Sequence, residues 1–234
     1  MDKDLANRIE TLAKLMFKSR YLVCFTGAGI STESGLPDFR GPDGLWTRME
    51  KGLPPKQTDK PWHLYEPNAG HYAIVELQNI GKLKFLITQN VDNLHLKSGI
   101  KPEIIAELHG NITKLRCPRC GMVYDRSWGF TVCKCGSHLV SSTVDFGQPL
   151  PERDLILAYE HSRKSDLFVV IGSSLVVTPA AHMPQEALKH GAKLVIINQG
   201  DTPFDRYAHL RFYEKIGDVL PPAVKRLKIL MGLE

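Results

Sequence analysis

Four cysteines within nineteen residues carry the clearest chemical signal in the sequence. They follow the pattern C-x2-C-x12-C-x-C and are Cys117, Cys120, Cys133 and Cys135. Four thiolates at this spacing satisfy a tetrahedral Zn2+ ion with no open coordination position, which is typical of a structural site. A redox role for the cysteines, or the replacement of one of them by His138, is the alternative.

A second group of polar residues follows four short apolar runs. The runs cover 21–26, 83–88, 167–172 and 193–198, and they end in the phrases TGAGISTESGLPDFRG, TQNVDNLH, IGSSL and INQG. A turn needs one or two polar side chains, and TQNVDNLH holds more than that. Four such phrases rich in Gly, Ser, Thr, Asn and Gln together favour one ligand that carries phosphates and ribose.

The glycines of the first phrase match only part of a dinucleotide fingerprint. Gly27 and Gly29 form G-x-G, but Thr32 takes the place of the third glycine, so a tight turn explains the fragment equally well. Amide donors near Gly29 could hold a pyrophosphate. The acidic residue expected about 20 positions later is missing, which disfavours hydride transfer. Asn90, Asp92 and a nearby histidine instead indicate chemistry on the ribose, so that the dinucleotide is consumed.

The four apolar runs predict the scaffold that positions these residues. Helical patterns separate them at 73–80, 155–164 and 179–190, another covers 219–230, and Asn68 is a plausible N-cap of the first. Near-continuous apolar strands that alternate with helices predict a Rossmann-like α/β fold, a parallel sheet with helices on both faces. Ligands bind such sheets beyond the carboxyl ends of the strands. The cysteine block interrupts the alternation and is predicted to form a small inserted zinc-binding module.

Composition narrows the class of protein. The chain has 234 residues, 43% of them hydrophobic, and a net charge of +5 without a long Lys/Arg run, so nucleic acid is not indicated. No apolar run approaches 18 residues, and the first 19 residues read as an amphipathic helix rather than a secretion signal. We expect a cytoplasmic monomer without a membrane segment. Cys24, inside YLVCFT, is predicted to be a core residue rather than a nucleophile.

The motifs together resemble those of sirtuins, NAD-dependent protein deacylases. GAGISTESGLPDFRG, TQNVDNLH, ELHG at 107–110, the four cysteines, GSSL and INQG occur in the sirtuin order over nearly the whole chain. The stretch 41–56 is similar to nuclear sirtuins with a short helical module, whereas GSSLVVTPAA and GDTPFD are similar to bacterial and archaeal members. The resemblance implies one catalytic domain, 1–234. Its Rossmann-like large part would comprise 1–40, 81–110 and 140–234, and its small module 41–80 and 111–139.

The resemblance also implies a reaction. Nicotinamide leaves the ribose of NAD, the acyl-lysine oxygen attacks C1′, and an O-alkylamidate forms. A histidine base then helps the 2′-hydroxyl attack this intermediate, which yields lysine and O-acyl-ADP-ribose. By motif His109 is the base, with Asn90 and Asp92 as further catalytic residues, and a usual histidine pKa of about 6.5 suits this task. His95 is the rival base, and we expect it to serve structure.

The matching motifs supply the expected binding residues. Phe39 would shield C1′ from water or anchor its loop in the core, and Trp46 belongs either to the core or to the cofactor loop. The phrase VDFGQPLP resembles the substrate strand of sirtuins, with Asp145 in place of an aromatic residue and Gln148 in place of Glu. Peptide binding by strand addition is expected at Val144, Phe146 and Gly147. NAD binding is expected at Gly27, Ala28, Gly29, Ser31, Thr32, Asp38, Phe39, Arg40, Gln89, Asn90, Asp92, Gly172, Ser173, Ser174, Asn198, Gln199 and Ile216.

Two other functions fit the same sequence. A mono-ADP-ribosyltransferase would use the same NAD site with a protein nucleophile. A non-enzymatic module that binds NAD or nucleic acid would not need His109 or the Asn90-Val91-Asp92 phrase, which are both intact. The residues before PDFRG lack the Ala and Tyr-x-x-Arg pattern of a pocket for acidic acyl groups. We therefore expect an acyl-lysine protein or peptide with a neutral acyl group, acetyl or longer.

Overall fold

A parallel sheet forms the body of the protein. The computed structural model describes residues 3–234, so the first two residues of the predicted N-terminal helix lie outside it. The six strands run in the order β3-β2-β1-β7-β8-β9, and every neighbouring pair is parallel. The predicted parallel sheet is confirmed. The strands are β1 (Leu22–Thr26), β2 (Leu83–Thr88), β3 (Ile105–Glu107), β7 (Leu167–Ile171), β8 (Lys193–Ile197) and β9 (Leu210–Phe212).

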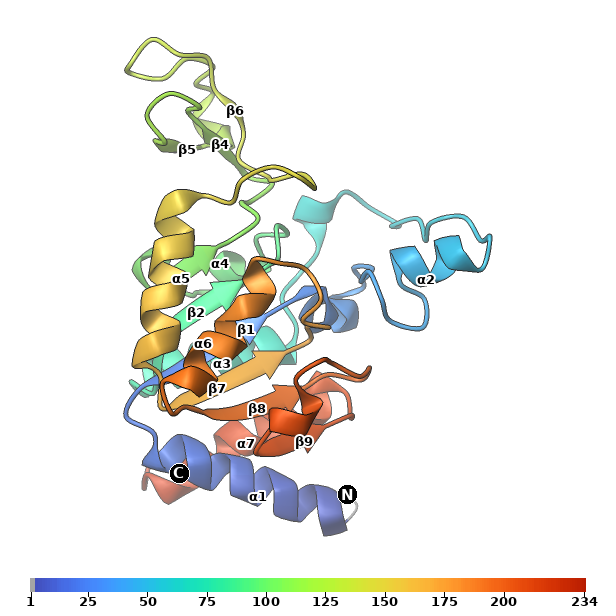
Figure 1. Cartoon of the computed structure of the whole chain (residues 1–234), viewed down its shortest axis with the longest axis vertical. Helices are drawn as coiled ribbons and strands as arrows, with labels where there is room; N and C mark the ends of the chain where they lie inside the picture. The colour runs from blue at the N-terminus through green and yellow to red at the C-terminus, as the bar shows by residue number, and fades with distance from the viewer. Residues whose placement is uncertain (1–2) are drawn as a thin grey trace.

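Helices cover both faces of the sheet, as the fold class requires (Figure 1). Successive residues of a strand point to opposite faces, so Cys24 packs with one helical layer and Phe25 with the other. Cys24 is fully buried, and burial raises the pKa of its thiol to about 12, which confirms a core role. One layer contains α1 (Lys3–Lys18), α3 (Ala69–Asn79) and α7 (Ile216–Leu230), and the other contains α5 (Glu152–Lys164) and α6 (Met183–Lys189).

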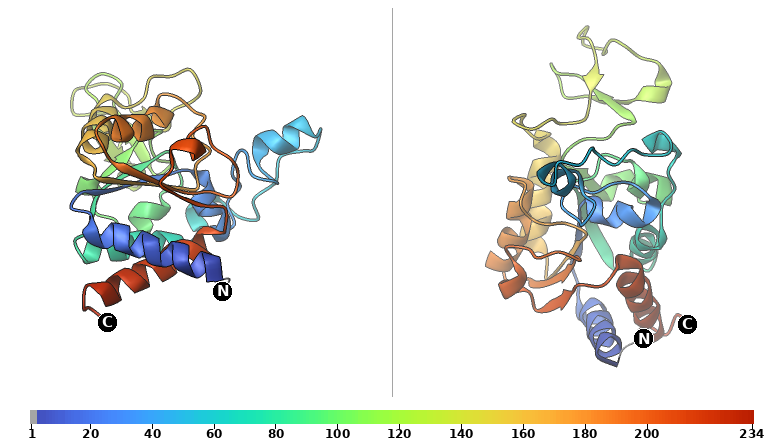
Figure 2. Two further views of the ribbon diagram at one scale, coloured as in Figure 1. Left: turned by 60° about the horizontal axis from the view of Figure 1, so that its bottom comes forward. Right: turned by 90° about the vertical axis from the view of Figure 1, so that its right-hand side faces the viewer.

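The N-terminal and C-terminal helices pack side by side at the end of the molecule that lies away from the small module (Figure 2). Arg8 of α1 binds Glu214, just before α7, with 2.6 Å between Nη2 and Oε1. Among the helices within residues 3–234, none is long and apolar enough to cross a membrane.

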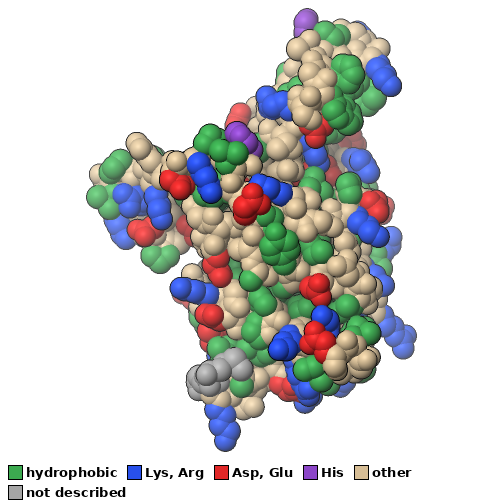
Figure 3. Space-filling model, turned by 180° about the vertical axis from the view of Figure 1, so that it is seen from behind, with side chains coloured by type: hydrophobic (Ala, Val, Ile, Leu, Met, Phe, Trp, Pro, Cys, Tyr) green, Lys and Arg blue, Asp and Glu red, His purple; other side chains and the backbone are tan. Residues whose placement is uncertain are grey.

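The cysteine block forms a separate antiparallel sheet of β4 (Lys114–Arg116), β5 (Val123–Asp125) and β6 (Val140–Ser141). Hydrophobic side chains show on the surface of this projecting module (Figure 3), and Trp128 is 62% exposed there. A second projection carries the short helix α2 (Leu45–Glu50). Helix α3, which the sequence analysis assigned to the small module, instead contributes Ala73 and Ile74 to the core of the large sheet. The division of the chain into a large part and a small module stays a prediction.

Asn68 fixes the start of α3, as its position before the apolar pattern predicted. Its side-chain oxygen accepts a hydrogen bond of 2.9 Å from the Gly70 N–H, which satisfies one of the unpaired amides of the first turn. Its Nδ2 donates to the Ile30 carbonyl at 2.7 Å and to Ser34 Oγ at 2.9 Å. The cap therefore also ties α3 to the 3-10 helix Ala28–Ser34 that follows β1.

We expect Asn68→Ala to lower the free energy of unfolding by about 1–2 kcal/mol, because it removes an N-cap and two tertiary hydrogen bonds. Urea unfolding would measure the change. Asn7→Ala, on an exposed face of α1, is the control and should change stability by less than about 0.5 kcal/mol. Equal stability of the two variants would contradict the role of Asn68.

Candidate functional site

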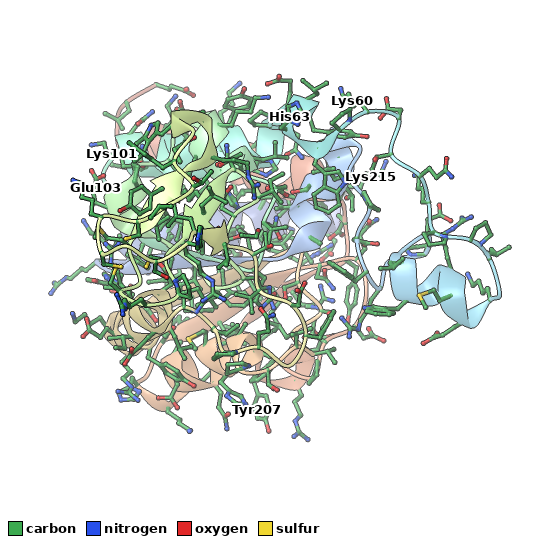
Figure 4. The ribbon with its side chains drawn as sticks, turned by 90° about the horizontal axis from the view of Figure 1, so that it is seen from above. Lys60, His63, Lys101, Glu103, Tyr207 and Lys215 are labelled. Atoms are coloured by element: carbon green, nitrogen blue, oxygen red, sulfur yellow. The ribbon has the colours of Figure 1, made fainter. Side chains whose placement is uncertain are left out.

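A cavity of about 1220 Å³ opens at the carboxyl ends of β1, β2, β7 and β8. It exceeds the roughly 300–1,000 Å³ of common small-molecule sites, which leaves room for a dinucleotide and part of a second substrate. Every residue predicted for catalysis, NAD binding or peptide binding lines it, from Gly27 to Ile216. Seen from above, the projection that carries α2 extends to one side, with Lys60 and His63 near its junction with the body (Figure 4).

The glycines at the end of β1 serve close packing between two loops. A side chain on Gly29 would lie 2.8 Å from the Gly172 backbone, and one on Gly172 would lie 2.3 Å from the Ile30 nitrogen. The Gly29 N–H donates to the Gly172 carbonyl at 2.8 Å, and the Gly27 N–H donates to the Ile171 carbonyl at 3.1 Å. The amide of Gly29 itself is therefore bonded inside the protein, and the prediction that amide donors near it hold a pyrophosphate stays a prediction. Glycine is needed here because only it allows the two loops to approach this closely.

Asn90 and Asp92 are joined through Ser31, which comes from the end of a different strand. Ser31 Oγ donates to Asp92 Oδ2 at 2.6 Å, and Asn90 Nδ2 donates to Ser31 Oγ at 3.2 Å. The Leu94 N–H donates to the other oxygen of Asp92 at 3.0 Å. Burial raises the pKa of Asp92, while the Ser31 hydrogen bond acts in the opposite direction. Asn90 and Asp92 are 8% and 5% exposed, so these bonds fix their side chains before any ligand binds.

The hydrogen bonding of His109 leaves one of its ring nitrogens available as a proton acceptor. Its Nδ1 lies 2.9 Å from the Gln89 carbonyl oxygen. A carbonyl can only accept, so Nδ1 must carry the hydrogen and Nε2 presents a lone pair. Burial lowers the pKa of His109, although the bond to Gln89 opposes the shift, and the imidazole is therefore neutral at pH 7. The ring lies at the cavity wall with its free nitrogen able to accept a proton.

Three aromatic side chains form one wall of the cavity. The Trp46 ring centroid lies 6.4 Å from that of Phe39 and 5.9 Å from that of Phe146. Phe39 is 40% exposed, so it does not anchor its loop in the core, and Trp46 belongs to the cavity wall. The Trp46 Nε1–H is buried and has no hydrogen-bond partner within residues 3–234. Nearby, Asp38 Oδ1 accepts from the Gly41 N–H at 3.1 Å, and burial raises the pKa of Asp38.

The segment expected to pair with a peptide is a turn in this structure. The Gln148 N–H donates to the Asp145 carbonyl at 3.1 Å, and the Asp145 N–H donates to Gln148 Oε1 at 3.2 Å. Gly147 has φ = +82°, which favours glycine at this position. Of the two residues that depart from the sirtuin pattern, Gln148 bonds within the turn through its side chain, whereas Asp145 takes part only through its backbone. Val144 is tied to His109, because its N–H donates to the His109 carbonyl at 2.9 Å.

The four predicted metal ligands meet at one point of the small module. Their sulfur atoms all lie within 4.8 Å of one another, with 3.4 Å between Cys117 and Cys135 and 3.5 Å between Cys120 and Cys133. Zn–S bonds of about 2.3 Å in a tetrahedron place sulfur atoms at comparable separations, so the cluster fits a metal ion. His138 pairs with Val132 and is not part of the cluster.

Several charged residues that were not predicted as site residues also line the cavity, among them Glu33, Asp201 and Lys215. Glu33 lines it and accepts a hydrogen bond of 3.0 Å from the Gly217 N–H at the start of α7. Lys215 also lines it (Figure 4) and is a cation beside the predicted residue Ile216. Glu33 lies within the phrase GAGISTESGLPDFRG, so its motif was available as a signal, whereas the only signal for Lys215 was its position directly before Ile216.

Comparison with known proteins assigns the family. The model of the Sir2 family matches residues 27–60 and 54–179. The chain belongs to the Sir2 family. It is 41% identical to the NAD-dependent protein deacetylase SRT1 of Arabidopsis thaliana over 95% of this chain, and spans only 50% of that relative. It is also 41% identical to the NAD-dependent protein deacylase 2 of Archaeoglobus fulgidus, over 97% of this chain and 98% of the relative.

Solved Sir2 structures share the fold. A Sir2 complex with a p53 peptide and NAD+ has a TM-score of 0.74 and 34% identity, over 97% of this chain and 99% of that one. A Sir2 variant with deacetylated p53 peptide and 3′-O-acetyl ADP-ribose has a TM-score of 0.75 and 32% identity, with the same coverage. The Rossmann-like sheet with an inserted small module is thus the Sir2 architecture in this chain.

The cysteine cluster predicts one tightly bound Zn2+ per chain. We expect Cys135→Ala to lose the metal and to lower the melting temperature by more than about 4 °C, because metal binding contributes directly to the folding of such modules. Metal analysis and thermal unfolding measure the two effects. Cys24→Ala, in the core of the sheet, should keep the metal. A Cys135→Ala protein that loses zinc and keeps the parent melting temperature would contradict a structural role.

Proposed function

We propose that this chain is an NAD-dependent protein-lysine deacylase that consumes NAD and releases nicotinamide and O-acyl-ADP-ribose. The observation that carries the proposal is the neutral His109 ring, held by the Gln89 carbonyl with Nε2 directed to accept a proton. The names of the relatives and the NAD+ and acetyl ADP-ribose complexes of other Sir2 proteins support it.

The strand ends suggest how NAD would lie in the cavity. The adenosine half would extend over the ends of β7 and β8, where Ser173, Ser174 and Asn198 offer polar groups. The phosphates would lie near the 3-10 helix Ala28–Ser34, with the hydroxyl of Thr32 and the cation of Lys215 within the same cavity. This arrangement leaves the nicotinamide ribose beside the buried Asn90–Ser31–Asp92 group.

The residues around the ribose would act in sequence. Asn90 and Asp92, fixed by Ser31, would orient the ribose and the nicotinamide for departure. Attack of the acyl oxygen at C1′ requires that water stay out, and Phe39 and Trp46 would close that side of the cavity. His109 Nε2 would then take a proton from the ribose hydroxyl that attacks the acyl carbon. A neutral imidazole with a lowered pKa can do this at pH 7.

The wall next to the aromatic residues favours a neutral acyl group. The apolar residues Trp46, Ile112, Val144 and Phe146 all line the cavity. Apolar surface stabilises hydrocarbon chains and penalises an unpaired carboxylate. The peptide itself would bind along 144–147, which requires the turn at Gly147 to open into an extended segment. The monomeric state and the cytoplasmic location stay predictions.

Two variants separate the early and late steps. His109→Ala should lower deacylation by about 10²-fold or more, the usual contribution of a general base, and should retain more of its nicotinamide exchange. Asn90→Ala should lower both activities, because Asn90 lies beside the ribose from the start. Labelled-nicotinamide exchange and acyl-lysine loss are measured on each variant.

His190→Ala, at an exposed position after α6, is the control and should match the parent. Deacylation at the parent rate by His109→Ala would place the base elsewhere.

A further inference from the structure

Two buried histidines lie beneath the Gln89–Asn90 segment and have no part in the steps described above. His71 comes from the first turn of α3 and His95 from α4 (Leu94–Ser98), and their ring centroids are 4.9 Å apart. They are 0% and 3% exposed. Burial lowers the pKa of His71 to about 4 and that of His95 well below the usual value, so both rings are neutral at pH 7.

The partners of His95 define its tautomer. Thr26 Oγ1 donates its only hydrogen to Thr88 Oγ1, at 2.8 Å. His95 Nε2 lies 2.9 Å from the same Thr26 oxygen, which can therefore only accept from it. His95 thus carries its hydrogen on Nε2, and its Nδ1 is an acceptor.

The hydrogen-bond partner of His71 defines its tautomer as well, and this tautomer has a donor nitrogen where His95 has an acceptor. The Asn68 N–H donates to His71 Nδ1 at 3.3 Å, so the hydrogen of His71 is on Nε2. His71 Nε2 and His95 Nδ1 are both buried and have no hydrogen-bond partner within residues 3–234, each other included. One is a donor and the other an acceptor. Each would be costly to bury unpaired, and the ring separation is within reach of a bond of about 2.9 Å between the ring edges.

We propose that His71 Nε2–H donates to His95 Nδ1, directly or through one water molecule, and that the two histidines position Asn90 for loss of nicotinamide. The bond completes a one-way chain from the Asn68 N–H through His71, His95 and Thr26 to Thr88. Thr88 Oγ1 also accepts from the Asn90 N–H at 3.0 Å, so the chain ends on the backbone of the residue beside the ribose. The proposal rests on the proposed role of Asn90 in the reaction.

The chain also connects the two segments that would hold NAD. Asn68, at its start, bonds to Ile30 and Ser34 of the 3-10 helix after β1. Thr88, at its end, bonds to Asn90 after β2. Hydrogen bonds in a low-dielectric interior are strong and directional, so such a chain can hold two loops in one relative position. Histidine suits the middle of the chain because its neutral ring supplies one donor and one acceptor.

Substitution of His95 tests the positioning role. His95→Leu should lower kcat for nicotinamide exchange and for deacylation in parallel by about 10-fold or more, with little change in KM for NAD, because a small displacement of a reacting group can cost up to about 10²-fold. His95→Gln should recover part of the loss, since its amide can still donate to Thr26. Thr26→Val should lower both activities similarly, and its combination with His95→Leu should cost no more than either change alone.

Cys24→Ala is the matched control, because Cys24 lies two residues before Thr26 on the same face of β1 and is fully buried without a part in the chain. It should keep the parent kcat. If Cys24→Ala loses as much activity as His95→Leu, or if the Thr26 and His95 losses multiply, the histidines serve packing alone and the proposal is wrong. A folded His95→Leu protein that keeps the parent kcat would also show that the proposal is wrong.

Nitrogen-15 NMR of the parent imidazoles gives a test that needs no activity. We expect both rings to be neutral at pH 7 with the hydrogen on Nε2. A hydrogen on Nδ1 of either ring, or a protonated ring, would overturn the chain. If the tautomers are as expected but the parent neither exchanges nicotinamide nor deacylates, the proposed function fails and the hydrogen-bonded chain stands.

Discussion

The parallel register of β1 with its two neighbours is the constraint on which the site depends. Thr26 pairs with Thr88 of β2 and with Ile171 of β7, so all three strands end at the same level. The loops that begin there must share one edge of the sheet. The register itself is fixed by apolar residues on both faces of each strand, since a slip of one residue would exchange the two helical layers.

Hydrogen bonds at that edge make the loops one rigid unit. The Gln89 N–H donates to the Thr26 carbonyl at 2.9 Å, and the Gly172 N–H donates to the Ile197 carbonyl at 2.8 Å. Ser173 Oγ donates to Gln89 Oε1 at 2.7 Å, so the loops after β2 and β7 also meet through side chains. Buried polar groups need hydrogen-bond partners, and in this protein residues of the candidate site serve as partners for one another. The groups that would surround the ribose are thus held in place without a ligand, whereas the outer walls at Phe39 and Phe146 are the exposed parts.

Much of this arrangement could be predicted from the sequence, because strong local patterns carry it. The four longer strands are mostly apolar, and Asn68 and the cysteine spacing mark a helix start and a metal cluster without tertiary information. The edge strands β3 and β9 are three residues long and lack such a pattern. The use of the Gly29 amide by Gly172 and the facing nitrogens of His71 and His95 depend on contacts between distant segments, which no local pattern encodes.

Product analysis tests the central claim, that the strand ends form a site in which NAD is consumed by an acyl-lysine. The protein is incubated with NAD and a peptide that carries an acetyl-lysine or a longer neutral acyl-lysine, and all products are quantified by mass spectrometry. The account predicts equal amounts of nicotinamide, free-lysine peptide and O-acyl-ADP-ribose. Unchanged NAD with every peptide, or ADP-ribose attached to protein without O-acyl-ADP-ribose, would contradict it.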